Sequence, residues 1–299
     1  MELKTASFKV ADHFFTVTMP DGDALWDRMG QYAPFKVDSP SEEPVFNLTL
    51  VDSLPEEEKE PFIIVDPEPG MSRIDVYKSG SGLVVEMAPL ASIPTVCILH
   101  MSGDFKQGKL QCIGEERSRL YSLNNSLMLL YAFSTCSKKT LLMHSSVTVH
   151  NGKGYMFLGK SGTGKSTHSR MWLENIPGCE LLNDDNPVIR AFDGEVRVYG
   201  SPWSGKTPCY RNLDYPVGAI VRIKRAPYNK ATRLSLMDSY ASVYTSCSSL
   251  RALRKIGDSL HEGITAVAMT APCFVMECLP DADAAFVCRK AVEDGEYDG

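Results

Sequence analysis

The sequence lacks the cysteine patterns that would place it in a disulfide-rich class. It has nine cysteines, and no two of them are spaced as Cys-x-x-Cys. Its first residues, Met1-Glu2-Leu3-Lys4-Thr5, also contain no apolar signal core. An odd and unpatterned set of cysteines in such a chain predicts reduced thiols in a cytoplasmic protein. No motif supports a catalytic cysteine.

Long apolar runs and long basic runs are missing as well. No apolar stretch approaches the roughly 18 residues that cross a bilayer, so we expect no membrane partner. The net charge is −6 and no basic run is long, which argues against nucleic-acid binding, because that requires clustered Lys and Arg. Hydrophobic residues make up 43% and charged residues 23%, as in ordinary globular proteins. The 299 residues suffice for two domains of about 100–200 residues each.

Residues 1–113 are predicted to form a small β-rich domain. Short runs of alternating or β-branched residues, separated by Gly, Pro and acidic turns, predict a set of antiparallel strands. No catalytic constellation is found there, so substrate recognition or self-association is the expected role. Whether the chain forms a homo-oligomer is left open by the sequence. Residues 114–138 are predicted to be a connecting helix. Its apolar stripe consists of Leu120, Leu123, Leu127, Leu130 and Ala132.

The third region, residues 139–299, is organised around one glycine-rich stretch. This stretch fits the pattern G-x-x-x-x-G-K-[ST] at every fixed position. An apolar strand over 154–158 precedes it and a helix over 168–175 follows it, which is the setting the motif requires. The alternative is a glycine-rich turn that matches by chance. The stretch is Gly159-Lys160-Ser161-Gly162-Thr163-Gly164-Lys165-Ser166-Thr167.

The residues of this loop predict phosphate binding. Its glycines allow successive N–H groups to turn toward one anion, and the helix that follows adds its positive end. Lys165 is expected to reach the terminal phosphates and Ser166 to coordinate Mg²⁺. The loop reads phosphates and not the base, so the nucleotide is ATP or GTP.

The segments around the loop predict a mixed arrangement of strands. A strand over 141–150 and the turn Asn151-Gly152 form an antiparallel hairpin that leads into the loop, unlike an ordinary parallel sheet. Further strands are expected at 179–182, 188–190, 195–199, 217–223 and 271–278, and helices at 235–247, 250–260 and 281–292.

Two adjacent carboxylates, Asp184 and Asp185, follow the strand after the loop helix. Phosphoryl transfer needs a carboxylate to help hold Mg²⁺ and can use another to accept the hydroxyl proton. The alternative is an ordinary Asp-Asp turn before Asn186-Pro187.

These motifs together resemble a known family. His144, the glycine-rich loop and the Asp184-Asp185 pair resemble the catalytic domain of HPr kinase/phosphorylase, which is similar to ATP-dependent phosphoenolpyruvate carboxykinase. The resemblance covers about residues 139–225, is weaker over 271–292, and leaves out residues 1–113. It implies an α/β fold for this region, with a mixed P-loop sheet and helices. The small β-rich domain predicted from the strand patterns precedes it.

The resemblance also implies roles for individual residues. Lys165 and the loop amides bind the nucleotide phosphates, and Ser166 and Asp184 hold Mg²⁺. Asp185 serves as the general base, although the resemblance does not decide which aspartate takes which role. His144 lies beside the site and tunes the phosphate or the base; the alternative is a buried strand histidine.

The sequence departs from this family in one place. We find no Gly-Arg-Asn-like signature after the loop, which leaves the HPr substrate and the reverse phosphorolysis open. Lys206 or Arg211 is the candidate for the positive charge on the transferring phosphoryl, the alternative for each being ordinary surface basicity. Trp203 is a candidate for stacking on a base or capping the site. His168 is a candidate for approaching phosphate or, alternatively, a surface residue.

The expected function is therefore Mg²⁺-assisted phosphoryl transfer from ATP (or GTP) to a serine-like hydroxyl on an unknown protein, peptide or small molecule. One alternative is a nucleotide-binding sensor or assembly module without transfer chemistry. Another is carboxykinase-like chemistry, for which no separate Mn²⁺ site or oxaloacetate-binding arginines can be placed.

Overall fold

The computed structural model describes residues 2–64, 66–68, 70–80, 82–205, 207–249 and 252–297. The chain divides into two compact units, Met1–Ser134 and Thr135–Gly299. The helix that the sequence predicts within residues 114–138 lies almost wholly in the first unit. No helix in the described ranges combines the length and the apolar character needed to cross a membrane.

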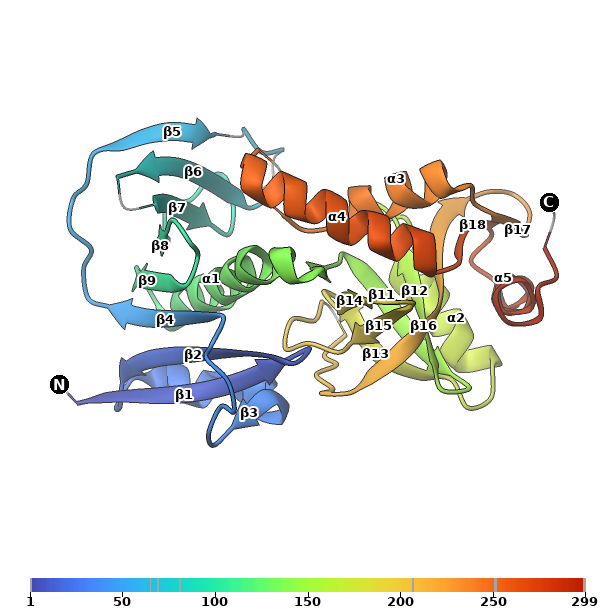
Figure 1. The fold of residues 1–299 in the computed structure, drawn as a ribbon, viewed down its shortest axis with the longest axis horizontal. Coiled ribbons are helices and arrows are strands. Elements are labelled where there is room, and N and C mark those ends of the chain that lie inside the picture. The colour runs from blue at the N-terminus through green and yellow to red at the C-terminus, as the bar shows by residue number, and fades with distance from the viewer. Residues whose placement is uncertain are drawn as a thin grey trace. The chain divides into compact units, whose positions relative to one another are not determined.

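The first unit is built on a mixed sheet that has nine strands in its described residues, in the order β3-β1-β2-β4-β9-β8-β7-β6-β5 (Figure 1). Hairpins pair β1 with β2, and β6 through β9, in antiparallel fashion. The strands are β1 Leu3–Val10, β2 His13–Pro20, β3 Lys36–Val37, β4 Phe46–Val51, β5 Lys59–Ile63, β6 Arg73–Ser79, β7 Gly82–Ala88, β8 Cys97–Ser102 and β9 Gln107–Cys112.

The prediction of an antiparallel set is wrong at β4, which pairs in parallel with both β2 and β9. Two short 3₁₀ helices, Ala24–Arg28 and Gly30–Phe35, lie between β2 and β4. A crossover of this length lets a strand return in the same direction, whereas a tight turn does not.

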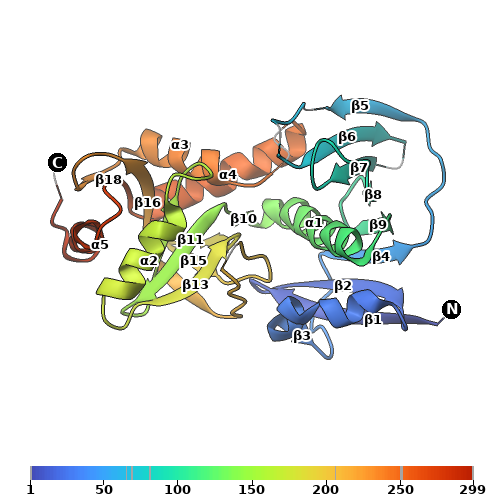
Figure 2. The same cartoon turned by 180° about the vertical axis from the view of Figure 1, so that it is seen from behind.

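The helix α1, Glu116–Thr135, packs beside β9 in both views of the fold (Figures 1 and 2). Leu123, Leu127 and Leu130 of the predicted stripe are fully buried, which confirms the helix. Contact with the sheet is close, since a Cβ on Gly108 of β9 would lie 2.5 Å from the Leu130 side chain. The Tyr131 hydroxyl donates a hydrogen bond of 3.0 Å to the carbonyl of Val10 in β1.

The second unit is built on another mixed sheet, in the order β10-β14-β15-β16-β12-β11-β13, with β18 joining β16 and β17. Its strands are β10 Thr140–Leu142, β11 Ser145–His150, β12 Lys153–Leu158, β13 Glu180–Asp185, β14 Val188–Phe192, β15 Glu195–Tyr199, β16 Asp214–Arg225, β17 Lys230–Arg233 and β18 Cys273–Cys278.

Two pairs of helices cover this sheet. α3, Leu236–Ser246, packs on α4, Arg254–Thr270, on one face, and α2, Lys165–Asn175, packs on α5, Ala282–Arg289, on the other (Figures 1 and 2). The core between α2, α5 and the sheet includes Trp172. α4 runs ten residues beyond the predicted end at 260, and β17 was not predicted.

The predicted hairpin into the glycine-rich loop is confirmed. β11 and β12 are antiparallel around Asn151 and Gly152, which have φ angles of 49° and 73°, whereas β12 and β16 are parallel. Asp193-Gly194 likewise joins β14 to β15 in an antiparallel pair.

The predicted strand over 141–150 is broken at Met143 and His144. β10 pairs with β14, and β11 pairs with β12 and β13. At the break, the backbone N–H of Met143 donates to the carbonyl of Pro187 and that of His144 donates to the carbonyl of Ser246, at 3.0 and 2.7 Å. These tertiary bonds satisfy the backbone where the chain changes partners.

Candidate functional site

The glycine-rich loop connects β12 to α2, and its backbone has a positive φ angle at three glycines, Gly159, Gly162 and Gly164. Gly159 has a φ of 155°, and a Cβ there would lie 2.4 Å from Thr163 Oγ1. Gly164 has a φ of 112° and is the N-cap of α2, where no side chain caps the helix. The first N–H groups of α2 are therefore left without a side-chain acceptor, and an anion is a favourable partner for such groups.

Lys165, the first residue of α2, is buried behind this loop. Its Nζ donates to the carbonyl of Gly159 at 3.0 Å and lies 3.2 Å from His144 Nε2. Burial lowers the pKa of Lys165, and the Asp185 and Asp184 carboxylates oppose that shift. The ammonium group is thus held at the inner edge of the loop.

His144 lies between Lys165 and Asp185. Its Nε2 is 3.2 Å from Asp185 Oδ1, and its side chain is 41% exposed. The alternative of a buried strand histidine does not hold, because His144 lies at the break between β10 and β11. An Nε2 without a hydrogen accepts a hydrogen bond from the ammonium of Lys165, and an Nε2 that carries a hydrogen donates one to the carboxylate of Asp185.

The two aspartates are the last residues of β13, not a turn after it. Asp184 is buried, and its Oδ1 accepts a hydrogen bond of 2.8 Å from Ser166 Oγ. Asp185 is turned toward His144 and has an unusual φ of 144° for a residue with a side chain. Its Oδ2 accepts from Asn186 Nδ2 at 2.9 Å. The pair therefore offers one carboxylate to Ser166 and the other to His144.

The loop after β15 donates hydrogen bonds to the backbone of the aspartate pair. The sequence analysis did not predict this contact. Ser204 Oγ donates to the carbonyl of Asp184 at 3.2 Å, and the N–H of Gly205 donates to the same oxygen. A Cβ on Gly205 would lie 2.9 Å from that oxygen, so glycine is needed there. Asn183 Nδ2 reaches the carbonyl of Trp203 at 3.2 Å. The only sequence signal was the Gly and Ser content of the loop.

The structure does not bring Arg211, one of the two predicted cations, into this group. Arg211 pairs with Glu180 at 2.7 Å and donates to the carbonyl of Leu181 at 2.8 Å. Glu180 begins β13 and Asp184 lies near its end, about 13 Å away at the usual rise of a strand. Lys206 lies outside the described residues.

Cations from β16 lie at the loop instead. Arg225 Nη2 donates to the carbonyl of Gly162, and Arg222 pairs in the sheet register with Leu158, the last residue of β12. Sequence reasoning missed both. The basic residues were visible in the sequence, with Arg222 inside the strand predicted at 217–223 and Arg225 just beyond it, but their position at the loop was not.

His168 and Trp203 are buried, so neither takes the role that the sequence offered. His168 Nε2 accepts from Trp172 Nε1 at 3.2 Å, and its ring meets Phe157 edge to face. Burial lowers the pKa of His168 to about 4. It is neither a surface residue nor a charged contact for phosphate. Trp203 is 5% exposed and cannot stack on a ligand in this arrangement.

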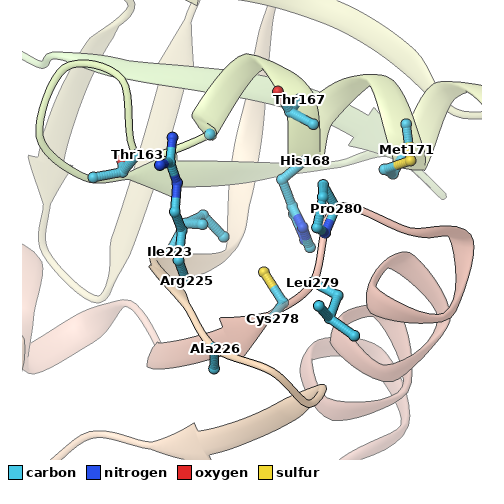
Figure 3. A pocket seen from close by; sticks show the side chains of 11 residues that line it. Thr163, Thr167, His168, Met171, Ile223, Arg225, Ala226, Cys278, Leu279 and Pro280 are labelled. Carbon is cyan, nitrogen blue, oxygen red and sulfur yellow. The ribbon is translucent and has the colours of Figure 1, made fainter.

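A hollow of about 380 Å³ adjoins the other side of the loop. Figure 3 shows Thr163 and Arg225 on one side of it and Met171 and Pro280 on the other. Its lining contains no carboxylate side chain, and most of its side chains are apolar. The lining residues are Thr163, Gly164, Thr167, His168, Met171, Ile223, Arg225, Ala226, Cys278, Leu279 and Pro280.

The described residues contain no group of three or more His, Cys, Asp or Glu side chains able to hold a metal ion. Ser166 Oγ and Asp184 Oδ1 are nonetheless adjacent hard oxygens. Mg²⁺ is commonly held by one or two protein oxygens together with substrate phosphates and water, so these two residues fit such an ion.

Comparison with known proteins adds a distant likeness. No protein-family model matches the chain, and no curated protein matches it. Among solved structures, the chain is similar to the HPr(Ser) kinase/phosphatase from Coxiella burnetii, with a TM-score of 0.31 and 10% identity over 52% of this chain and 95% of that one. A likeness this weak is at most a distant relationship of fold, and no activity follows from it.

Proposed function

We propose that the second unit binds a magnesium nucleoside triphosphate and transfers its γ-phosphoryl group to a hydroxyl acceptor. The observation that carries the proposal is the convergence of the Lys165 ammonium, the His144 imidazole and the Asp185 carboxylate, with successive distances of 3.2 Å, at the base of an uncapped helix N-terminus. Preorganised charges of this kind stabilise the charge that develops on a transferring phosphoryl group.

Each residue then has a task. The N–H groups of the loop and of the first turn of α2 bind phosphate oxygens, and Lys165 Nζ leaves the carbonyl of Gly159 to bind the terminal phosphates. Ser166 and Asp184 would hold Mg²⁺, and a bound Mg²⁺ would neutralise charge on the phosphates. The apolar hollow beside Thr167 takes the nucleoside. Without a carboxylate in its lining, this hollow gives no preference for guanine, so ATP and GTP are both candidates.

Transfer moves the γ-phosphoryl group from the nucleotide to the acceptor hydroxyl. The acceptor oxygen forms a bond to the γ-phosphorus, and the bond from that phosphorus to the β–γ bridging oxygen breaks. The hydroxyl proton passes to the carboxylate of Asp185, which His144 and Asn186 orient. A nucleoside diphosphate leaves. The acceptor is a serine-like hydroxyl of a protein, a peptide or a small molecule, and the first unit has the role of recognising it or of joining copies of the chain.

Nucleotide binding is tested first. Calorimetry of the full chain with Mg-ATP and Mg-GTP is expected to show binding that Lys165→Ala weakens by about 10–100-fold, as for the loss of a charge-assisted hydrogen bond. Asp184→Asn is expected to raise the Mg²⁺ concentration needed for binding. Heat absent from the wild-type titration, or unchanged binding in both variants, contradicts the proposal.

Transfer is tested second, with γ-labelled ATP and candidate acceptors. Label appearing on an acceptor supports the kinase. Binding without transfer to any acceptor favours the alternative of a sensor or assembly module, and release of CO₂ from oxaloacetate with ATP favours carboxykinase-like chemistry.

A further inference from the structure

Arg222 is a half-buried cation with neutral partners. In the described part of the chain no carboxylate lies within ion-pair distance of it. Its Nε donates to Ser242 Oγ at 2.8 Å, and its Nη2 donates to Thr245 Oγ1 at 2.6 Å, to Ser246 Oγ at 3.2 Å and to the carbonyl of Ser242. These acceptors belong to the C-terminal end of α3, where the helix dipole is negative.

A guanidinium in such surroundings is incompletely compensated. Burial lowers the pKa of Arg222, with no nearby acidic group raising it. Buried charges in proteins are normally paired with an opposite charge, because hydroxyl and carbonyl oxygens replace only part of the lost hydration. Nη1 of Arg222 donates to no group among the residues that the structure describes. An anion is a favourable acceptor for a hydrogen bond from this nitrogen.

The position of Arg222 indicates where that anion comes from. Arg222 lines a second hollow of about 630 Å³, together with Gly159 to Thr163 of the loop and with Lys224 and Arg225. All the charged side chains in this lining are basic. The phosphates that the loop would bind are the negative groups brought to this place.

The end of α3 also ties Arg222 to the proposed chemistry. Ser246 Oγ accepts from Arg222, and the carbonyl of the same residue accepts from the backbone N–H of His144 at 2.7 Å. The last turn of α3 thus contacts both the guanidinium of Arg222 and the backbone of His144, whose imidazole contacts Lys165 and Asp185. Arg222 and the proposed catalytic side chains are therefore linked through the same end of α3.

We propose that Arg222 binds the terminal phosphate of the nucleoside triphosphate through its free Nη1, in the place for which the sequence had offered Lys206 and Arg211. This inference rests on the proposed function. Arg is suited to the task because its planar donors match phosphate oxygens and its charge is permanent. The group that Arg222 reads is the γ-phosphate, so triphosphates are distinguished from diphosphates.

The test compares Mg-ATP with Mg-ADP on the full chain by calorimetry. Arg222→Gln is expected to weaken Mg-ATP by about 10–100-fold, as for a charge-assisted hydrogen bond, and Mg-ADP by less than about threefold. Arg170→Gln is the matched control. Arg170 is an exposed arginine on α2, 62% exposed and 3.8 Å from Glu174, and its loss is expected to leave both affinities within about twofold.

A purely structural role for Arg222 gives a different pattern. Ser242→Ala with Thr245→Val removes two side-chain acceptors of Arg222 but keeps the guanidinium, the carbonyl of Ser242 and Ser246 Oγ, and we expect it to reduce the preference for ATP over ADP less than Arg222→Gln does. Equal weakening of both nucleotides by Arg222→Gln, or no weakening, overturns the inference. If Arg222→Gln fails to fold, Arg222→Lys replaces it, because lysine keeps the charge but lacks the planar donors. A preference of Arg222→Lys for ATP over ADP equal to that of wild type overturns the inference.

The outcome separates this inference from the proposed function. A wild-type chain that binds neither nucleotide contradicts the proposed function, and the inference falls with it. If the wild-type chain binds both nucleotides and Arg222→Gln leaves the preference for ATP over ADP unaltered, only the role of Arg222 is contradicted and the proposed function stands.

Discussion

The two sides of the glycine-rich loop have opposite chemistry. On one side Lys165, His144 and Asp185 lie in a chain of polar contacts. On the other side the hollow that contains Met171 and Pro280 is largely apolar, and the histidine in its wall is buried. The difference teaches that one loop can separate a place for charged groups from a place for an apolar group, which is the division that the proposed nucleotide site would need.

The largest effect is expected on the polar side. Asp185→Asn removes the proposed base but keeps the shape of the side chain, so we expect phosphoryl transfer to fall by about 10²–10⁴-fold. Nucleotide affinity should stay within about threefold. Label transfer from γ-labelled ATP measures the first quantity and calorimetry the second.

The control for this experiment lies in the same strand. Glu180→Gln, at the exposed start of β13, changes one carboxylate to an amide away from the site and should leave transfer unaffected. Transfer at the wild-type rate in Asp185→Asn would remove Asp185 from the role of base.

An intermediate effect is expected on the apolar side, from His168. Burial lowers its pKa from 6.5 to about 4 in the folded chain. Between these values the unfolded chain binds the proton and the folded chain does not, so the contribution of His168 to stability is full above about pH 6.5 and is lost as the pH falls toward 4. From pH 7.5 to 5 the loss is about 2 kcal/mol, at ~1.36 kcal/mol per pH unit below the unfolded pKa.

Urea unfolding at the two pH values measures this loss. His168→Gln is the matched variant, because an amide oxygen can still accept from Trp172 Nε1 but does not titrate. The variant should lose less stability than wild type over the same interval. Equal losses in the two proteins would show that His168 is not held neutral by its surroundings.

Local patterns in the sequence were sufficient for much of the fold. Asn151-Gly152 and Asp193-Gly194 specify hairpins through their own backbone preferences, and the leucine stripe of α1 specifies which face is buried. The glycines, Lys165 and Ser166 also identified the loop, because strand, turn and helix are contiguous there.

Long-range pairing was not accessible in this way. β4 is parallel to its neighbours because of a crossover that no residue of β4 encodes. The break at Met143 and His144 interrupts a continuous apolar pattern, and it exists because Pro187 and Ser246 supply the backbone acceptors. Arg222 escaped notice for the same reason: only the register of β16 against β12 brings it to the loop.

The smallest effect is expected for Arg211, which the sequence offered as a site residue. Its ion pair with Glu180 joins side chains that are 32% and 61% exposed, so solvent screens it and Arg211→Gln should cost less than about 1 kcal/mol of stability. Nucleotide affinity and transfer should stay within about twofold of wild type, because the pair lies at the start of β13 and the aspartates lie at its end. A large loss of transfer with unchanged nucleotide affinity would mean that the acceptor, not the nucleotide, extends along β13 to Arg211. The polar side of the loop would then be one end of a longer substrate site, and the contrast between the two ends of this strand would no longer stand.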